Sequence, residues 1–168
     1  MIQLAQATLR QSITMATNRQ CAFGMGCFWA PQKRFSSLPG VQSSSVGYAG
    51  GLNTSPSYSS VCQGDGHIET VSVEYNDDEI SYAALLDVFF DRDVQEFASG
   101  KGQYSNVIWV KNEAERTAAE ERKQQLTEAG DAKAEMFSIR ELTNYYVAET
   151  YHLNYLQKQT PRTIMLVV

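Results

Sequence analysis

Two strand-like runs, residues 44–48 and 68–75, follow each other along this chain with only a long Gly- and Ser-rich loop between them. In the second run, Val71, Val73 and Tyr75 alternate with polar residues, which is the period of a β-strand with one apolar face. Two strands joined without a helix do not fit a fold in which every strand is followed by a helix. This feature argues against a strictly alternating architecture.

Elsewhere, predicted strands and helices do alternate. Residues 113–129, rich in Ala, Glu, Lys and Gln, form the clearest helix. A helix over 81–90 would bury Leu85, Leu86 and Phe89. Together these elements predict an α+β domain, in which helices pack on a mixed β-sheet. The other predicted elements are strands at 21–25, 107–110 and 137–142, a helix at 29–38, and an irregular or helical segment at 145–155.

Length and charge limit the number of domains and the class of partner. With 168 residues, 43% of them hydrophobic, we expect one domain across 1–168, with an N-terminal extension at 1–20 and a tail at 159–168. The formal net charge of −5 argues against nucleic acid as a partner, because phosphate binding needs a basic face. Segment 1–20 lacks the apolar core of a signal peptide, and no apolar run is long enough to span a membrane. We expect a monomer in the cytoplasm.

The cysteines restrict the chemistry. Cys21, Cys27 and Cys62 form no CxxC pair, and with only two histidines they do not make a disulfide framework or a metal site. The chain also lacks a GxGxxG motif after a strand, so no metal, flavin, nicotinamide or other cofactor is expected. We expect reduced thiols, as in cytosol.

Cys27 lies where the first predicted strand turns into the first predicted helix. Gly24 and Gly26 allow a tight turn there and leave room for another molecule to approach. Because unpaired N–H groups at a helix N-terminus stabilise an anion, we expect this thiol to ionise more easily and to act as a nucleophile. A buried, unreactive cysteine is the alternative, and Phe28 and Trp29 could equally be core residues.

Around and beyond this cysteine, several motifs in order resemble the peptide methionine sulfoxide reductases of the A class. The sequence GCFW at 26–29 is similar to the active-site signature of that family, and GHIE at 66–69 is similar to its Gly-His-x-Glu motif. The resemblance covers roughly residues 21–158 and implies a single catalytic domain that repairs oxidised methionine. The other matching motifs are LPGV at 38–41, GYAGG at 47–51, PSYSSVC at 56–62, ISYAALLDVFF at 80–90, QY at 103–104 and YYVAETYHLNYL at 145–156.

The resemblance implies roles in reducing methionine-S-sulfoxide, free or in oxidised proteins, to methionine. It makes Cys27 the nucleophile that attacks the sulfur, releases methionine and becomes a sulfenic acid. Glu69 is the neutral acid that protonates the sulfoxide oxygen, and burial among aromatic neighbours would raise its pKa as this role requires. The hydroxyls of Tyr48 and Tyr104 would hydrogen-bond that oxygen.

The resemblance also makes Phe28 and Trp29 the walls of an apolar pocket around the S-methyl group of the substrate. Without a ligand to face, both would be ordinary core residues. His67 and His152 are expected to make structural hydrogen bonds beside the site rather than to act as bases.

The chain departs from the family between residues 91 and 104. The usual His-Asp-Pro element and Gly-Asn-Asp-x-Gly loop are altered or shortened here. The active-site aspartate of the family falls on Ser99, which supplies no carboxylate, although Asp93 or Glu96 could approach the place. We expect lower activity or a changed substrate range, since losing one preorganised group costs roughly 10- to 1000-fold.

The sulfenic acid must be reduced again after each turnover. Many family members use a second cysteine near the C-terminus, but no cysteine follows Cys62 here. Cys21 lies about 20 Å from Cys27 along an extended strand, too far for a disulfide. The sequence therefore predicts reset by an external thiol, from thioredoxin, glutaredoxin or glutathione, with Cys62 as the alternative.

Two other classes of function stay open. A weakly active or inactive relative that binds oxidised methionine would keep the aromatic pocket, and the altered segment 91–104 favours it. A thiol hydrolase would need a histidine paired with Cys27, and neither histidine carries a local signature of that role.

Overall fold

The computed structural model describes residues 17–159, so the expected extension at 1–20 and tail at 159–168 lie almost wholly outside the described residues. The strands are β1 (Asn18–Met25), β2 (Val41–Ala49), β3 (Ile68–Asn76), β4 (Asn106–Val110), β5 (Ser138–Glu141) and β6 (Tyr145–Val147). The helices are α1 (Trp29–Ser36), α2 (Tyr58–Cys62), α3 (Tyr82–Phe90), α4 (Val94–Ala98), α5 (Glu113–Glu128) and α6 (Tyr155–Lys158), with 3-10 turns η1 (Gly102–Tyr104) and η2 (Ala132–Glu135).

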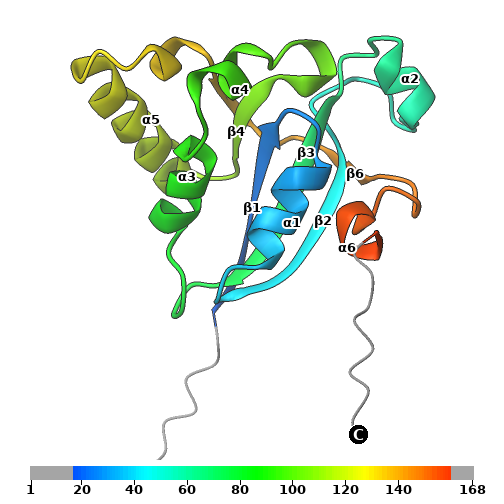
Figure 1. The fold of residues 1–168 in the computed structure, drawn as a ribbon, viewed down its shortest axis with the longest axis horizontal. Coiled ribbons are helices and arrows are strands. Elements are labelled where there is room, and N and C mark those ends of the chain that lie inside the picture. Colours follow the sequence, from blue (N-terminus) through cyan, green and yellow to red (C-terminus); the bar gives the residue numbers. More distant parts are fainter. Residues whose placement is uncertain (1–16, 160–168) are drawn as a thin grey trace, which may run out of the picture.

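These six strands form one mixed sheet in the order β5-β4-β1-β3-β2-β6 (Figure 1). β4 and β5 are parallel, and the other neighbouring strands are antiparallel. β2 and β3, the two runs joined without a long helix, pair directly with each other. α1 lies across one face of the sheet, and α3 and α5 pack together beside β1 and β4 (Figure 1). The predicted α+β class with a mixed sheet is confirmed.

β3 shows why the core lies under α1. Val71 and Val73 are buried in the main hydrophobic cluster together with Phe35 of α1. The predicted alternation is therefore confirmed, but the opposite face is not exposed, because Thr70 and Ser72 are buried as well. The hydroxyl of Thr70 accepts a hydrogen bond from the indole of Trp109 at 3.0 Å, which satisfies its polar atom inside the protein.

Helices α3 and α5 begin after residues whose side chains cap their free N–H groups. Ser81 accepts a hydrogen bond from the backbone at the start of α3, and Asn112 does so for α5. The predicted helices at 81–90 and 113–129 therefore match α3 and α5 to within a residue. Between residues 17 and 159, the structure contains no helix with the length and apolar character needed to cross a membrane.

Three segments hold structure that the sequence pattern does not reveal. The loop before β3 contains the short helix α2, and segment 91–104 contains α4 and η1. Residues 145–155, predicted as irregular or helical, begin instead with strand β6, which pairs with the end of β2. All three segments lie close to Cys27 or Glu69, as the site shows.

Candidate active site

Cys27 lies in the turn between β1 and α1, as predicted, and its side chain is exposed. Gly26 precedes it with a φ of 77°, a conformation that side chains other than glycine rarely adopt. A Cβ at Gly26 would meet no atom within 4 Å, so backbone conformation rather than lack of space requires glycine here. The turn thus presents the thiol at the surface at the start of α1.

The ionisation of Cys27 differs from the sequence-based expectation. Burial raises the pKa of this thiol above its ordinary value of 9.0, and the nearby carboxylate of Glu69 acts in the same direction. The backbone N–H of Trp29 lowers the pKa, as expected for a helix start, but it does not outweigh burial. The expectation of a lowered thiol pKa is therefore wrong for this structure.

Glu69 supplies a buried carboxyl next to this turn. It lies on β3 on the same face as Val71, because side chains two apart on a strand share a face. Its oxygens accept hydrogen bonds from the backbone N–H of Phe28 at 3.1 Å and from the amide of Gln103 at 3.3 Å. Burial raises the pKa of Glu69 to about 7, against the effect of these two hydrogen bonds. Near neutral pH the group can therefore hold or release a proton.

The two predicted tyrosines lie in different surroundings. Tyr48 is the Cα partner of Glu69 across β2 and β3, is buried, and donates its hydroxyl proton to Glu149 at 2.8 Å. Tyr104 is 37% exposed, and burial together with Glu69 raises the pKa of its hydroxyl. A hydrogen bond with Gln103 opposes this rise in the pKa of Tyr104, so its hydroxyl is engaged by an amide at the surface, whereas that of Tyr48 is engaged by a carboxylate in the interior.

Two residues near the site received no role from the sequence. Glu149 accepts hydrogen bonds from the backbone N–H of Tyr58 and from the hydroxyl of Tyr48, both at 2.8 Å. Burial acts to raise the pKa of Glu149, but these hydrogen bonds hold it below its ordinary value. A hydrogen bond with Cys62 and, next, burial raise the pKa of Tyr58 to about 12, and Tyr104 and Glu69 contribute. Both residues lie inside motifs noted above, and the motifs alone did not separate them from their neighbours.

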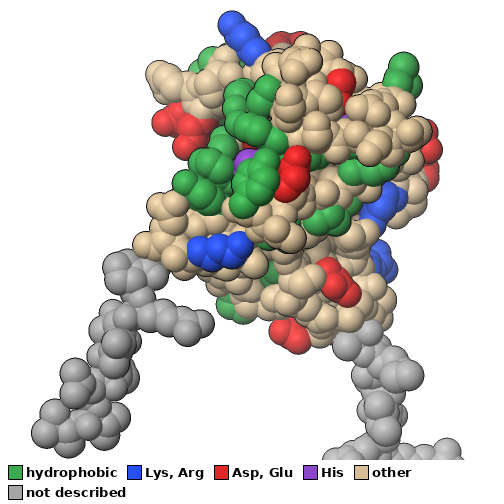
Figure 2. Space-filling view, turned by 90° about the vertical axis from the view of Figure 1, so that its right-hand side faces the viewer, with side chains coloured by type: hydrophobic (Ala, Val, Ile, Leu, Met, Phe, Trp, Pro, Cys, Tyr) green, Lys and Arg blue, Asp and Glu red, His purple; other side chains and the backbone are tan. Residues whose placement is uncertain are grey.

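The predicted aromatic walls are partly enclosed by other rings. Phe28 is only 2% exposed and contacts the rings of Tyr48 and His152. Trp29 is half-buried, stacks on Tyr155 at 3.9 Å and donates its indole N–H to His152 at 3.3 Å. Figure 2 shows hydrophobic side chains gathered on this face of the molecule. A pocket for a methyl group on Phe28 and Trp29 stays a prediction.

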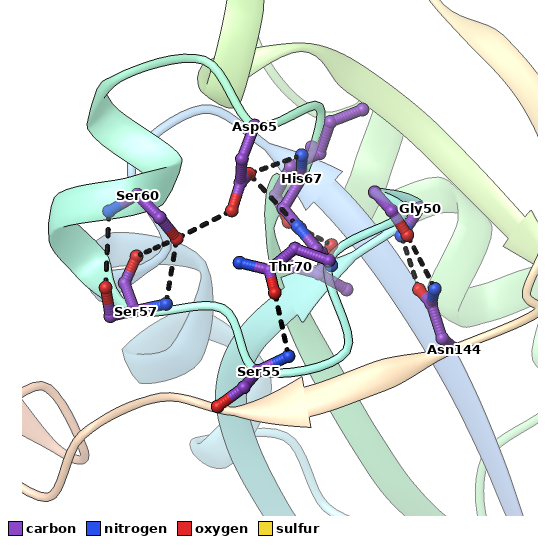
Figure 3. Close-up of polar contacts among 11 residues, drawn as sticks. Gly50, Ser55, Ser57, Ser60, Asp65, His67, Thr70 and Asn144 are labelled. Carbon is purple, nitrogen blue, oxygen red and sulfur yellow. Dashed lines mark hydrogen bonds and ion pairs between the residues drawn. The ribbon is translucent and has the colours of Figure 1, made fainter.

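His67 makes a structural hydrogen bond rather than facing Cys27. Its Nδ1 lies 3.0 Å from Asp65, which also accepts a hydrogen bond from Ser60 at 2.7 Å (Figure 3). A Cβ at Gly51 would come within 2.2 Å of the His67 ring, so glycine is required there by space. This network fixes α2, which carries Tyr58. Across residues 17–159, no three His, Cys, Asp or Glu side chains come together as a metal site.

Segment 91–104 brings a serine and a carboxylate to the other side of the cysteine. Ser99 and Glu96 line a cavity of about 270 Å³ that Cys27 also lines. The hydroxyl of Ser99 donates to the backbone of Glu96 at 2.8 Å, and Asp93 caps α4. Of the two acids considered in place of the missing aspartate, Glu96 therefore reaches this cavity.

Comparisons with known proteins agree with this geometry. A profile of the family described as "Peptide methionine sulfoxide reductase" matches residues 19–168. The chain is 41% identical to the peptide methionine sulfoxide reductase MsrA of Salinispora arenicola, over 80% of this chain and 65% of that protein. It is 37% identical to the MsrA of Acinetobacter baumannii, over 83% of each. The reduced form of Mxr1 from Saccharomyces cerevisiae has a similar structure, with 28% identity and a TM-score of 0.73, over 84% of this chain and 86% of that one.

Proposed function

The chain belongs to the peptide methionine sulfoxide reductase family of enzymes, and from that premise we propose how its own residues carry out the reduction. The substrate is methionine-S-sulfoxide, free or in oxidised proteins, and Cys27 is the nucleophile. The single observation that carries this assignment is a buried carboxyl with a pKa of about 7, Glu69, held by the backbone next to an exposed thiol. A general acid is most effective when its pKa lies near the working pH.

In the first step, the sulfur of Cys27 attacks the sulfoxide sulfur while Glu69 gives a proton to the oxygen. The hydroxyl group so formed transfers to the Cys27 sulfur, which becomes a sulfenic acid, while the bond between the two sulfurs and the sulfur–oxygen bond of the substrate break and methionine leaves. The proton lost by the Cys27 thiol replaces the one that Glu69 gives, so no net proton is consumed. Tyr104 donates a hydrogen bond to the oxygen in this proposal, which is supported by its exposure and by the effect of Glu69 on the pKa of its hydroxyl. The same role for Tyr48 requires that its hydroxyl first leave Glu149.

Phe28 and Trp29 face the S-methyl group in this proposal. Trp29 is the stronger candidate because its half-buried ring keeps surface for a ligand, while Phe28 is 2% exposed. Stacking on Tyr155 and the hydrogen bond to His152 hold the Trp29 ring in one orientation. A rigid apolar wall of this kind would distinguish the two sulfoxide epimers by the place of the methyl group.

The sulfenic acid is then reduced by an external thiol. Cys21 is fully buried, so it offers no thiol to Cys27. Cys62 lies nearer, since the amide of Gln103 contacts both its sulfur, at 3.7 Å, and Glu69. Thioredoxin, glutaredoxin and glutathione are the candidate reductants, and the yeast relative Mxr1 has been solved in complex with Trx2.

One experiment tests the nucleophile and the reset together. Reduced protein is incubated with methionine-S-sulfoxide and no reductant, and methionine, free thiols and dimedone adducts are measured. We expect about one methionine per chain, a dimedone adduct on Cys27 and two remaining thiols. Cys27→Ser should release no methionine, whereas Cys21→Ser and Cys62→Ser should retain the first turnover. Turnover by Cys27→Ser would refute the function, and a disulfide between Cys27 and Cys62 would refute external reset.

Ser99 gives a specific reason to keep a second function in view. Where the family supplies an aspartate, this chain offers a hydroxyl that already donates to the backbone. A protein that binds oxidised methionine without reducing it would show saturable binding of the sulfoxide and no methionine in the same incubation.

A further inference from the structure

Cys27 has a second accessible side, away from the carboxyl acid. The cavity of about 270 Å³ opens between the start of α1 and the segment that carries α4. Its wall includes Cys27 and Ser99, while Glu69 and Tyr104 are not among the described residues that line it. Cys27 therefore borders this cavity, whereas Glu69, whose charge acts on the pKa of the Cys27 thiol, does not.

The cavity wall carries two arginines although the protein as a whole is acidic. It contains the guanidinium groups of Arg34 and Arg92 and a single carboxylate, that of Glu96. Arg34 donates to the backbone oxygen of Asp91 at 2.8 Å, lies 3.7 Å from the exposed carboxylate of the same residue, and keeps 42% of its side chain exposed. A bound anion could therefore reach it without displacing a buried partner.

The guanidinium group of Arg92 has hydrogen-bond partners for only some of its N–H groups. Its Nη1 donates to Asn106 at 3.0 Å, and its guanidinium lies over the ring of Phe97 at 4.0 Å. Its Nη2 is buried and has no hydrogen-bond partner among residues 17–159.

 

The Nε of Arg92 donates to the backbone oxygen of Phe89 at 3.0 Å. Burial lowers the pKa of Arg92 to about 10. A buried cation of this kind is stabilised by an added negative charge.

We propose that this cavity binds the carboxylate of a small thiol, which attacks the sulfenic acid of Cys27 from the side opposite Glu69. The inference rests on the proposed function and names the class of its reductant: a small, anionic thiol such as glutathione, rather than a protein. Arg34 and Arg92 would hold the carboxylate, and the thiol sulfur would face Cys27.

The direction of attack follows from the first step. The sulfenic oxygen is left on the side of Glu69, where it was protonated, and a displacement at sulfur proceeds in line with the leaving group. The incoming thiolate therefore approaches from the cavity side. The sulfur–oxygen bond of Cys27 breaks, a mixed disulfide forms, and water leaves with the thiol proton. A second thiol molecule then releases Cys27 as a thiol and departs as the oxidised disulfide.

The size of the cavity favours a small molecule. Ligand sites typically measure about 300–1,000 Å³, and this cavity, at about 270 Å³, lies just below that range. It can take a small thiol or part of one. A protein reductant would instead have to reach Cys27 from the open surface, where Arg34 and Arg92 would contribute little to its binding.

The test compares three small thiols that differ in charge: mercaptopropionate, mercaptoethanol and cysteamine. The sulfenic acid is formed in the Cys62→Ser protein, and the rate of its loss is measured at equal thiolate concentration. We expect mercaptopropionate to react about tenfold faster than mercaptoethanol, and cysteamine to be slowest, as for one charge-assisted contact. Arg34→Gln should lose most of this preference, and Glu96→Gln should increase it. Arg116→Gln, on the distant helix α5, is the matched control and should leave it unchanged.

Equal rates with the three thiols, or an unchanged preference in Arg34→Gln, would overturn the inference. Reset by thioredoxin with no measurable reaction of the small thiols would do so too. Methionine released in the first turnover is measured in the same samples, so a failure of the proposed function is seen separately. If no methionine is released, hydrogen peroxide can form the sulfenic acid on Cys27, and the charge preference can still be measured.

Discussion

Changing Glu69 to Gln separates two consequences of burying this carboxyl. The amide keeps the shape and can still accept the hydrogen bond from Phe28, but it has no proton to transfer. Loss of a general acid typically costs about 10²- to 10⁴-fold in rate. In the wild type, Glu69 ionises at high pH inside the protein, where burial makes the charge unfavourable. Gln cannot ionise, so the inactive variant should be more stable than the wild type at high pH.

The size and sign of the change in stability with pH follow from the pKa of Glu69 in the folded protein. Burial raises the pKa of Glu69 from 4.5 to about 7 in the folded protein. The folded state therefore binds the proton more tightly than the unfolded chain, and stability from this group is full below pH 4.5 and is lost as pH rises through 7. At 1.36 kcal/mol per tenfold change, the loss amounts to up to about 3 kcal/mol. Gln cannot ionise and should not show it.

Chemical denaturation at pH 4.5, 7 and 9, followed by circular dichroism, measures this difference. The free energy of unfolding of Glu69→Gln, relative to wild type, should rise with pH by up to about 3 kcal/mol. Glu74→Gln, which changes an exposed carboxyl on the same strand, is the control and should show no such trend. A constant difference between Glu69→Gln and wild type at all three pH values would refute the buried, raised pKa.

Three further predictions concern the hydroxyls, the packing and the pH profile. Tyr104→Phe should lower kcat by about 10-fold or more, and Tyr48→Phe should lower it by less because the Tyr48 hydroxyl is already bound to Glu149. Initial rates at saturating sulfoxide measure both effects. A larger loss in Tyr48→Phe would assign the hydrogen bond to the sulfoxide oxygen to Tyr48. Gly51→Ala should lower the free energy of unfolding by about 1–3 kcal/mol in denaturation, because its Cβ would overlap His67; unchanged stability would show that the ring can move. The pH dependence of kcat/KM should be level between about pH 7 and the higher pKa of Cys27.

The strands could be predicted because their pattern is local. The alternation along β3 placed Val71 inward, and the same period puts Glu69 on that face. The turn at Cys27 was likewise visible, since glycine before a helix marks the place where the chain reverses. These features depend on near neighbours, so the sequence carries them.

Other parts of the site depend on distant contacts. Glu149 meets Tyr48 across 101 positions of sequence, and strand β6 exists because it pairs with β2. The helices α2 and α4 are each five residues long, too short for a periodic signal. The pKa of Cys27 was predicted in the wrong direction because the helix start is visible in the sequence, whereas burial, which outweighs it, is not.

Cys27 can act as the nucleophile in spite of its raised pKa, because the first step consumes no net proton. The thiol loses one proton and the sulfoxide oxygen gains one, so the reactive state pairs a thiolate with protonated Glu69. That state holds as many protons as the thiol with ionised Glu69, and its population is therefore independent of pH between the two pKa values. Ionised Glu69 raises the pKa of Cys27, so transfer of the proton to Glu69 also removes the charge that opposed the thiolate. Below about pH 7 an extra proton keeps the thiol neutral, and above the pKa of Cys27 the acid is lost. A value of kcat/KM that falls steadily from pH 7 upward would show instead that the neutral thiol attacks.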